Sequence, residues 1–323
     1  MNFRRIRYHA TRRSLSPKLG FVHMPKAGGT GLIADIEATL RPLCVTGGID
    51  RSQTGSFTAF STVPSAFRGG IIVDPMEIPA ATDVIAGHFA RKTIETRFPG
   101  ANLVTILREP RARLLSHWFY LGNYTDDVLA LYGDWGQTLA LARRSLAKFI
   151  SAPAIACHTD NLMTRMLLWP HDRIPPAGFI APQDDAMLID AARAAIDRFA
   201  FVDVLENPAM HDRLIQFLRH AYGQTIWSRL ERLIYARRGA PRNEAAPPTP
   251  GARQAMADEL TGRCHDLLDQ RSRLDRHLWR HIAARALPQA DLDTLAETSY
   301  RRTVDRFDRL IAASQPAPIN DAA

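Results

Sequence analysis

The sequence predicts an α/β fold, a three-layer sandwich in which helices flank a mainly parallel sheet. Apolar runs at 19–24 and 103–107 have the composition of buried strands, and each ends in a turn that a helical pattern follows. Similar runs lie at 83–89 and 201–206. Because strands and helices alternate, ligands are expected beyond the carboxyl ends of the strands.

The first strand leads into a glycine-rich loop. From Pro25 to Gly31 the chain reads P-K-A-G-G-T-G, and a helical pattern begins at Leu32. A helix that begins directly after such a loop points free backbone N–H groups into it, so a phosphate or sulfate can bind there. Lys26 and Thr30 add a cation and a hydroxyl. A plain structural turn uses the same residue types and is the alternative for this loop taken alone.

The order of residues in the loop separates its possible ligands. In the nucleotide-triphosphatase loop G-x-x-x-x-G-K-[ST], lysine follows the last glycine and the hydroxyl after it binds Mg²⁺. Here Lys26 precedes the glycines, and Ala27 follows the lysine. A nucleotide-dependent, kinase-type phosphoryl transferase is therefore the second interpretation rather than the first.

A second charged turn follows the strand at 103–107 and reads R-E-P-R-A-R-L-L-S. Pro110 suits the first turn of a helix, where its missing N–H costs nothing, and Ser116 lies about two turns beyond Arg108. The donors of an arginine and a serine hydroxyl can bind one phosphate together. Neither Arg111 nor Arg113 need contact the phosphate. The alternative is that Arg111 lies on a solvated helix face and that Arg113 stabilises the turn.

Together the two turns resemble those of sulfotransferases that use 3′-phosphoadenosine 5′-phosphosulfate (PAPS). The first is similar to their P-K-x-G-G-T-[SG] loop, which holds the 5′-phosphosulfate, and the second to their R-[DE]-P-x-x-R-x-x-S segment, which binds the 3′-phosphate. The resemblance implies a P-loop-like architecture and no metal. The chain departs from the family pattern at Ala27, where the family often has threonine. It assigns the donor contacts to Pro25, Lys26, Ala27, Gly28, Gly29, Thr30, Gly31, Arg108 and Ser116.

A histidine ends the run at 83–89, in the sequence Gly87-His88-Phe89. A histidine beside a phosphate loop can act as a general base, because its ordinary pKa of about 6.5 lets it accept a proton at neutral pH. A structural histidine is the alternative. The segment is similar to the position of the proposed base in the carbohydrate, heparan-sulfate-type branch of the family. The resemblance implies in-line sulfuryl transfer to a hydroxyl, with His88 as base and Lys26 stabilising the developing charge.

The charge balance bears on the partners of the chain. It has 323 residues, 41 Lys and Arg against 33 Asp and Glu, and a formal net charge of +8. The basic residues are spread along the chain without a nucleic-acid motif, so the expected partners are the donor and a glycan acceptor, for which the basic balance favours a charged glycan. A non-catalytic protein that binds a polyanion is a third interpretation, but it would not need both Lys26 and His88.

Composition also bears on location and on metals. No run of eighteen apolar residues exists, so no membrane span is expected. The Ala- and Arg-rich usage favours a bacterial, cytoplasmic enzyme. Three cysteines lie far apart without a C-x-x-C pair, so neither a zinc site nor a disulfide framework is expected.

The remaining segments are predicted as one domain, residues 19–313, between a basic tail at 1–18 and a loose tail at 314–323. The irregular segment 41–83 is expected to carry acceptor contacts. Roles stay open for Asn161 and Arg165, which share a helix face, for Glu206, and for a Pro-rich loop. That loop covers 236–251, and further helical patterns cover 139–150, 161–169, 185–199, 210–222, 252–287 and 291–313.

Overall fold

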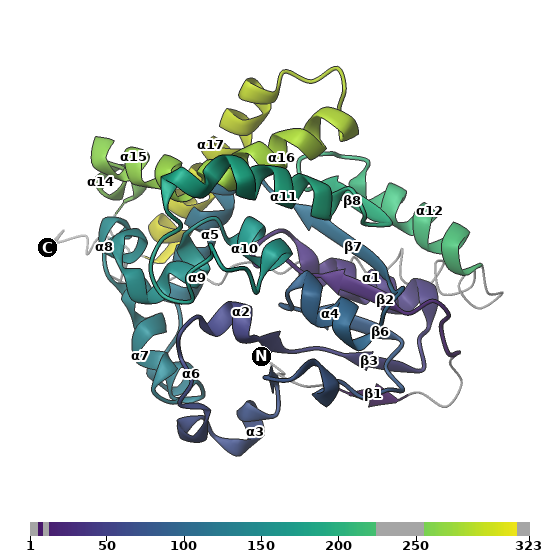
Figure 1. Cartoon of the computed structure of the whole chain (residues 1–323). Helices are drawn as coiled ribbons and strands as arrows, with labels where there is room; N and C mark the ends of the chain where they lie inside the picture. The colour runs from purple at the N-terminus through teal and green to yellow at the C-terminus, as the bar shows by residue number, and fades with distance from the viewer. Residues whose placement is uncertain (1–5, 9–12, 224–254, 315–323) are drawn as a thin grey trace, which may run out of the picture.

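The computed structural model describes residues 6–8, 13–223 and 255–314. Its main sheet has six strands in the order β1-β3-β6-β2-β7-β8 (Figure 1). The strands are β1 (Arg7–Tyr8), β2 (Leu19–Val22), β3 (Cys44–Thr46), β6 (Val84–Gly87), β7 (Asn102–Leu107) and β8 (Phe201–Val204). Within this sheet β1 pairs antiparallel with β3, and the other neighbouring strands run parallel. The sequence prediction of an α/β fold with a mainly parallel sheet is confirmed.

The central strand β2 lies between β6 and β7 and aligns the segments that follow all three strands. Val22 of β2 is level with Gly87 of β6, which directly precedes His88. On the other side β7 ends at Leu107, directly before Arg108. Because the three strands are parallel, the glycine loop, His88 and Arg108 all leave the same edge of the sheet.

Helices pack on both faces of the sheet. The face that carries Phe21 contacts α1 and α12, and the face that carries Val22 contacts α4, α10, α11 and α16. Alternate residues of a strand point to opposite faces, which explains why all of β2 is buried. The helices are α1 (Gly29–Leu40), α4 (Arg91–Arg97), α5 (Pro110–Gly122), α10 (Leu162–Leu168), α11 (Asp185–Ile196), α12 (Met210–Tyr222), α16 (Arg273–Ala286) and α17 (Leu292–Ser314).

A second group of helices gathers around α5, which begins just beyond the carboxyl end of β7. Pro110 occupies the first turn of α5, and the Glu109 carboxylate caps it by accepting from the Ala112 amide at 2.7 Å. Phe119 of α5 stacks on Phe307 of α17, with ring centroids 4.1 Å apart. The C-terminal helices lie far from β1 in Figure 1. Each helix in the described part of the chain is too short or too polar to cross a membrane.

The segment 41–83 is more ordered than predicted. It contributes β3 to the main sheet, β4 (Ile49–Asp50) and β5 (Ile71–Ile72) to a two-stranded sheet, and the short helices α2 (Arg51–Thr54), α3 (Ser65–Arg68), η1 (Phe60–Thr62) and η2 (Pro75–Glu77). The prediction missed β3 because its stability comes from tertiary contacts rather than from a long apolar run. The buried Asp83 carboxylate accepts from the backbone N–H of Cys44 at 3.0 Å, which fixes the start of β3.

Part of the predicted N-terminal tail packs against the domain. Leu15 is buried, and its backbone N–H donates to Asp83 at 3.0 Å. Lys18 forms an ion pair with the same carboxylate at 2.7 Å. Residues 13–18 are therefore held at the amino ends of the strands. The predicted loop at 236–251 and tail residues 315–323 lie outside the described residues.

The predicted helix at 139–150 is broken. It divides into η3 (Ala140–Arg143) and α8 (Leu146–Ser151), because Arg144 between them is extended. The Trp118 indole donates to the Arg144 carbonyl at 3.1 Å, and the Glu259 carboxylate accepts from the Leu146 amide at 2.8 Å. Hydrogen bonds to residues distant in the sequence thus replace the backbone hydrogen bonds of a continuous helix at this point. The other short helices are α6 (Asp126–Ala130), α7 (Trp135–Leu139), α9 (Ala156–Thr159), α14 (Met256–Glu259), α15 (Gly262–Arg271), η4 (Pro153–Ile155) and η5 (Pro182–Asp184).

Candidate functional site

A cavity of about 830 Å³ lies where β2, β6 and β7 end. Most of the predicted site residues line it, although they come from distant parts of the sequence. Ala27 is buried and does not line the cavity, and Thr30 lies in the first turn of α1. The predicted residues in the wall are Pro25, Lys26, Gly28, Gly29, Gly31, His88, Arg108 and Ser116.

The glycine loop brings the start of α1 to the cavity. Lys26 and Gly28 have left-handed backbone, with φ of 68° and 80°, a conformation that glycine adopts without strain. Gly29 opens the helix, and a Cβ there would lie 2.1 Å from the His23 ring. Glycine is therefore required at Gly29 by close packing. The first N–H groups of a helix have no partner within it, so this end of α1 can bind an anion.

Lys26 places a cation in the same wall. Its Nζ lies 4.0 Å from the centroid of the Tyr120 ring, which holds it by a cation–π contact. Burial, together with the nearby charges of Arg108 and Arg306, lowers the pKa of Lys26 to about 8. The positive charges of Lys26, Arg108 and Arg306 lie close enough together to lower the pKa of Lys26, and this favours a negatively charged ligand at this point.

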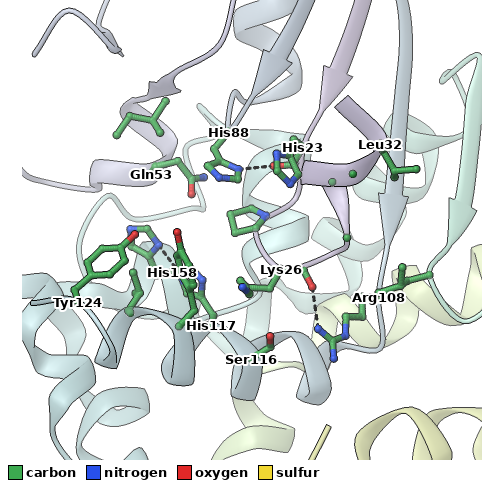
Figure 2. A pocket seen from close by; sticks show the side chains of 18 of the residues that line it. His23, Lys26, Leu32, Gln53, His88, Arg108, Ser116, His117, Tyr124 and His158 are labelled. Carbon is green, nitrogen blue, oxygen red and sulfur yellow. Dashed lines mark hydrogen bonds between the residues drawn. The ribbon is translucent and has the colours of Figure 1, made fainter. Parts of the chain in front are cut away.

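Arg108 is anchored by the protein and retains donors for a ligand. Nη1 donates to the Lys26 carbonyl at 3.0 Å, and Nη2 donates to Thr303 Oγ1 of α17 at 2.6 Å. The buried Nε has no hydrogen-bond partner among the described residues. Burial lowers the pKa of Arg108, while Glu206 and Glu109 oppose that shift. Ser116 lies near Arg108 on α5, as Figure 2 shows.

His88 is oriented as a proton acceptor. Its Nδ1 lies 2.7 Å from the His23 carbonyl oxygen. Because a carbonyl can only accept, Nδ1 carries the proton, and Nε2 of the neutral ring is left as an acceptor. Burial lowers the pKa of His88, the carbonyl opposes that effect, and Lys26 adds to it. The ring is therefore neutral at pH 7, the state that a general base requires.

His23 positions the proposed base and was not predicted from the sequence. Its ring lies between Phe21 and His88, with centroid distances of 5.3 and 4.4 Å. Burial, His88 and Lys26 lower its pKa well below the ordinary value, so His23 is neutral. The sequence held one signal for this position. Side chains alternate along a strand, so His23, two residues after Phe21, continues the face of β2 that carries Phe21.

The sequence also missed the contribution of α17. Arg306, Phe307, Arg309 and Leu310 line the cavity. These residues lie near the opposite end of the sequence from the glycine loop, and no local sequence pattern links the two segments. Aromatic and uncharged side chains complete the wall away from Arg108, namely Ile49, Gln53, His117, Tyr120, Leu121, Tyr124, Tyr132, Trp135, Leu139 and His158.

Two arginines beside Arg108 do not line the cavity. Arg111 forms ion pairs with Glu109 at 3.1 Å and Glu297 at 3.4 Å, so it joins α5 to α17. Arg113 is almost fully buried, and its Nη2 donates to the His158 carbonyl at 3.4 Å. Burial lowers the pKa of Arg113 to about 10. Both arginines support α5, which agrees with the alternative given for Arg113.

The residues whose roles were open also bind within the protein. Arg165 pairs with Asp160 at 2.9 Å, and Asn161 accepts from the Leu274 amide at 2.8 Å. Glu206 accepts from the Trp279 indole at 3.0 Å and from the hydroxyl of Ser299 on α17 at 2.7 Å. These contacts join β8 and α10 to the C-terminal helices.

Neither a scan against protein-family models nor a search of the curated proteins finds a match for this chain. Within the described residues, no group of three or more His, Cys, Asp and Glu side chains is placed to hold a metal ion. The cavity and its charges therefore carry the functional argument.

Proposed function

We propose that this protein transfers the sulfuryl group of PAPS to a hydroxyl group, as sulfotransferases of the carbohydrate type do. The observation that supports this proposal most directly is that Lys26, Arg108 and the neutral His88 line one cavity beside the start of α1. PAPS carries anionic groups at its 5′ and 3′ ends. Two separate cationic centres are suited to such a ligand, and the acceptor nitrogen of His88 is suited to a hydroxyl.

In this proposal each group has one task. The start of α1 and Lys26 bind the 5′-phosphosulfate, and Arg108 with Ser116 binds the 3′-phosphate. The acceptor oxygen forms a bond to sulfur while the bond from sulfur to the phosphate oxygen breaks. The hydroxyl proton passes to His88 Nε2, and Lys26 stabilises the charge on the departing phosphate. The products are a sulfate ester and 3′-phosphoadenosine 5′-phosphate.

The proposal includes the finer architecture that the resemblance implies, a three-layer, P-loop-like sandwich. Its support is that helices pack on both faces of the sheet and that α1 begins directly after the loop that follows β2. A bacterial, cytoplasmic location is part of the same proposal and rests on composition.

The two rival functions fit the site less well. A kinase of the P-loop type binds Mg²⁺ through a hydroxyl after the lysine, and here the buried Ala27 follows Lys26. A protein that only binds polyanions gains nothing from a partly buried, neutral histidine whose tautomer is fixed by the His23 carbonyl.

The test is a calorimetric titration of the protein with 3′-phosphoadenosine 5′-phosphate, ADP, and ATP with Mg²⁺. We expect the bisphosphate to bind without metal and at least about tenfold more tightly than ADP, a difference of about 1.4 kcal/mol. Tighter binding of ATP with Mg²⁺ would favour a kinase. Absence of binding by the bisphosphate would overturn the proposal.

A further inference from the structure

A buried carboxyl group lies behind the cavity wall, between the short helix α2 and the segment that carries His88. It belongs to Asp50, which is only 3% exposed and does not line the cavity. Burial raises the pKa of this carboxyl, and hydrogen bonds from neighbouring hydroxyl and backbone N–H groups oppose the shift. A carboxyl group is costly to bury unless it is hydrogen-bonded, so the partners of Asp50 show what its presence achieves.

The two oxygens of Asp50 bind two different segments. Oδ1 accepts from the Ser52 backbone N–H at 3.0 Å and from the Ser52 hydroxyl at 2.5 Å, in the first turn of α2. Oδ2 accepts from the Ala90 backbone N–H at 2.7 Å and from the Thr93 hydroxyl at 2.6 Å. Ala90 directly precedes α4, and Thr93 lies in its first turn. One carboxyl group therefore joins α2 to the start of α4.

The backbone of His88 is held by the same segment. Its N–H donates to the Gly48 carbonyl at 2.9 Å, and its carbonyl accepts from the Asp50 backbone N–H at 3.3 Å. The Asp50 side chain then binds the backbone of Ala90, two residues farther along. The His88 ring donates from Nδ1 to the His23 carbonyl at 2.7 Å. Because the backbone is fixed at and after His88, the ring stays within reach of that carbonyl.

The hydrogen bonds of Asp50 also reach the cavity at Gln53. Gln53 Nε2 donates to Ser52 Oγ at 3.2 Å. Because the Ser52 hydroxyl donates its one proton to Asp50, Ser52 Oγ can only accept from Gln53, which fixes the orientation of the amide. Gln53 and His88 both line the cavity, and Figure 2 shows their side chains pointing into it. The carboxyl group of Asp50 thus orients two polar side chains of the cavity.

We propose that Asp50 is a positioning residue that holds His88 and Gln53 ready for the acceptor, an inference whose purpose rests on the proposed sulfuryl transfer. Asp50 does not line the cavity, so it acts through its hydrogen bonds rather than by contact with a substrate. By fixing the backbone around His88 it keeps Nδ1 bonded to the His23 carbonyl. His88 Nε2 then stays free to accept the proton of the acceptor hydroxyl.

The test measures the tautomer of His88 by long-range proton–nitrogen NMR on the whole protein, with His88→Gln to identify the signal. In wild type we expect the form protonated at Nδ1. Asp50→Asn keeps the size of the side chain, but its NH₂ group replaces an oxygen that accepts a backbone N–H, so donor faces donor on one side. The ratio of the two tautomers should then shift about two- to tenfold, the equivalent of one hydrogen bond. An unchanged ratio would overturn the inference.

Two further variants separate positioning from general destabilisation. Asp83 is also buried and accepts from two backbone N–H groups at 3.0 Å, but at the amino ends of the strands. Asp83→Asn should therefore lower stability without moving the His88 signal, and an equal shift there would overturn the inference.

Thr93→Val removes only one hydrogen bond of Asp50, so it tests the inference even where Asp50→Asn does not fold. We expect a smaller shift of the His88 tautomer in the same direction, and no shift would contradict a role for Asp50. Calorimetric titration with 3′-phosphoadenosine 5′-phosphate keeps the two proposals apart. Failure of the wild type to bind it would overturn the proposed function, whereas a tautomer shift in Asp50→Asn would still support the positioning of His88.

Discussion

The cavity has a cationic side and a neutral side, and the two are built from different parts of the chain. Lys26 and Arg108 follow strands of the sheet, and the cationic side gains only Arg306 and Arg309 from a distant helix. The neutral side comes from helices and connecting segments outside the sheet and is formed by Gln53, His117, Tyr124, Tyr132, Trp135 and His158. Under the proposed function the cationic side binds the donor, the neutral side faces the acceptor, and His88 lies at the boundary between the two sides.

The largest expected effect tests that boundary. His88→Gln keeps an amide that can donate to the His23 carbonyl but removes the basic nitrogen, so sulfuryl transfer from PAPS to a hydroxyl acceptor should fall about 10²- to 10⁴-fold. Calorimetric binding of the bisphosphate should change little. The control is His281→Gln, because His281 pairs with Asp197 outside the cavity. Transfer rates that stay near wild type in His88→Gln would assign the base to another group.

A second prediction concerns the packing that supports the cationic side. Gly29→Ala would place a Cβ 2.1 Å from the His23 ring, which is itself confined by Phe21 and His88. We expect a loss of about 1–3 kcal/mol in the free energy of unfolding, the usual cost of overpacking. Urea denaturation measures it. Gly31→Ala is the matched control, because a Cβ there meets nothing within 4 Å. Equal stability of the two variants would contradict this role of Gly29.

The third prediction concerns the response of the cationic side to pH. The pKa of Lys26 is lowered to about 8, so this lysine loses its charge as the pH rises through that value. Affinity for the bisphosphate should then fall by up to about tenfold per pH unit above 8, the limit for loss of one proton. Calorimetric titrations with the bisphosphate from pH 7 to about 9 measure this fall. Titrations across this range would contradict the account if bisphosphate affinity stayed constant.

Much of the fold could be predicted because apolar runs and glycine or proline turns are local signals. The runs at 19–24, 83–89 and 103–107 became adjacent strands, and their loops met at one edge of the sheet. The strand at Cys44–Thr46 could not be found in this way, because a buried carboxylate from Asp83 helps to define it.

The site divides in the same manner. Lys26, His88 and Arg108 follow strands and stood out by type and position. Arg306 lines the cavity only because α17 packs on α5, a long-range contact without a sequence signature. The hydrogen bond between His117 and His158 was equally hidden, since it depends on how α5 and α9 meet.

The most direct measurement of the central claim compares two ligands that differ by one phosphate. Wild type, Arg108→Ala and Arg111→Gln are titrated with 3′-phosphoadenosine 5′-phosphate and with adenosine 5′-phosphate. If Arg108 binds the 3′-phosphate, Arg108→Ala should weaken the bisphosphate by about 1.5–3 kcal/mol, the range for a hydrogen bond to a charged group. Adenosine 5′-phosphate should lose much less, and Arg111→Gln should change neither. Equal losses for both ligands in Arg108→Ala would contradict a separate site for the 3′-phosphate and with it the division of the cavity.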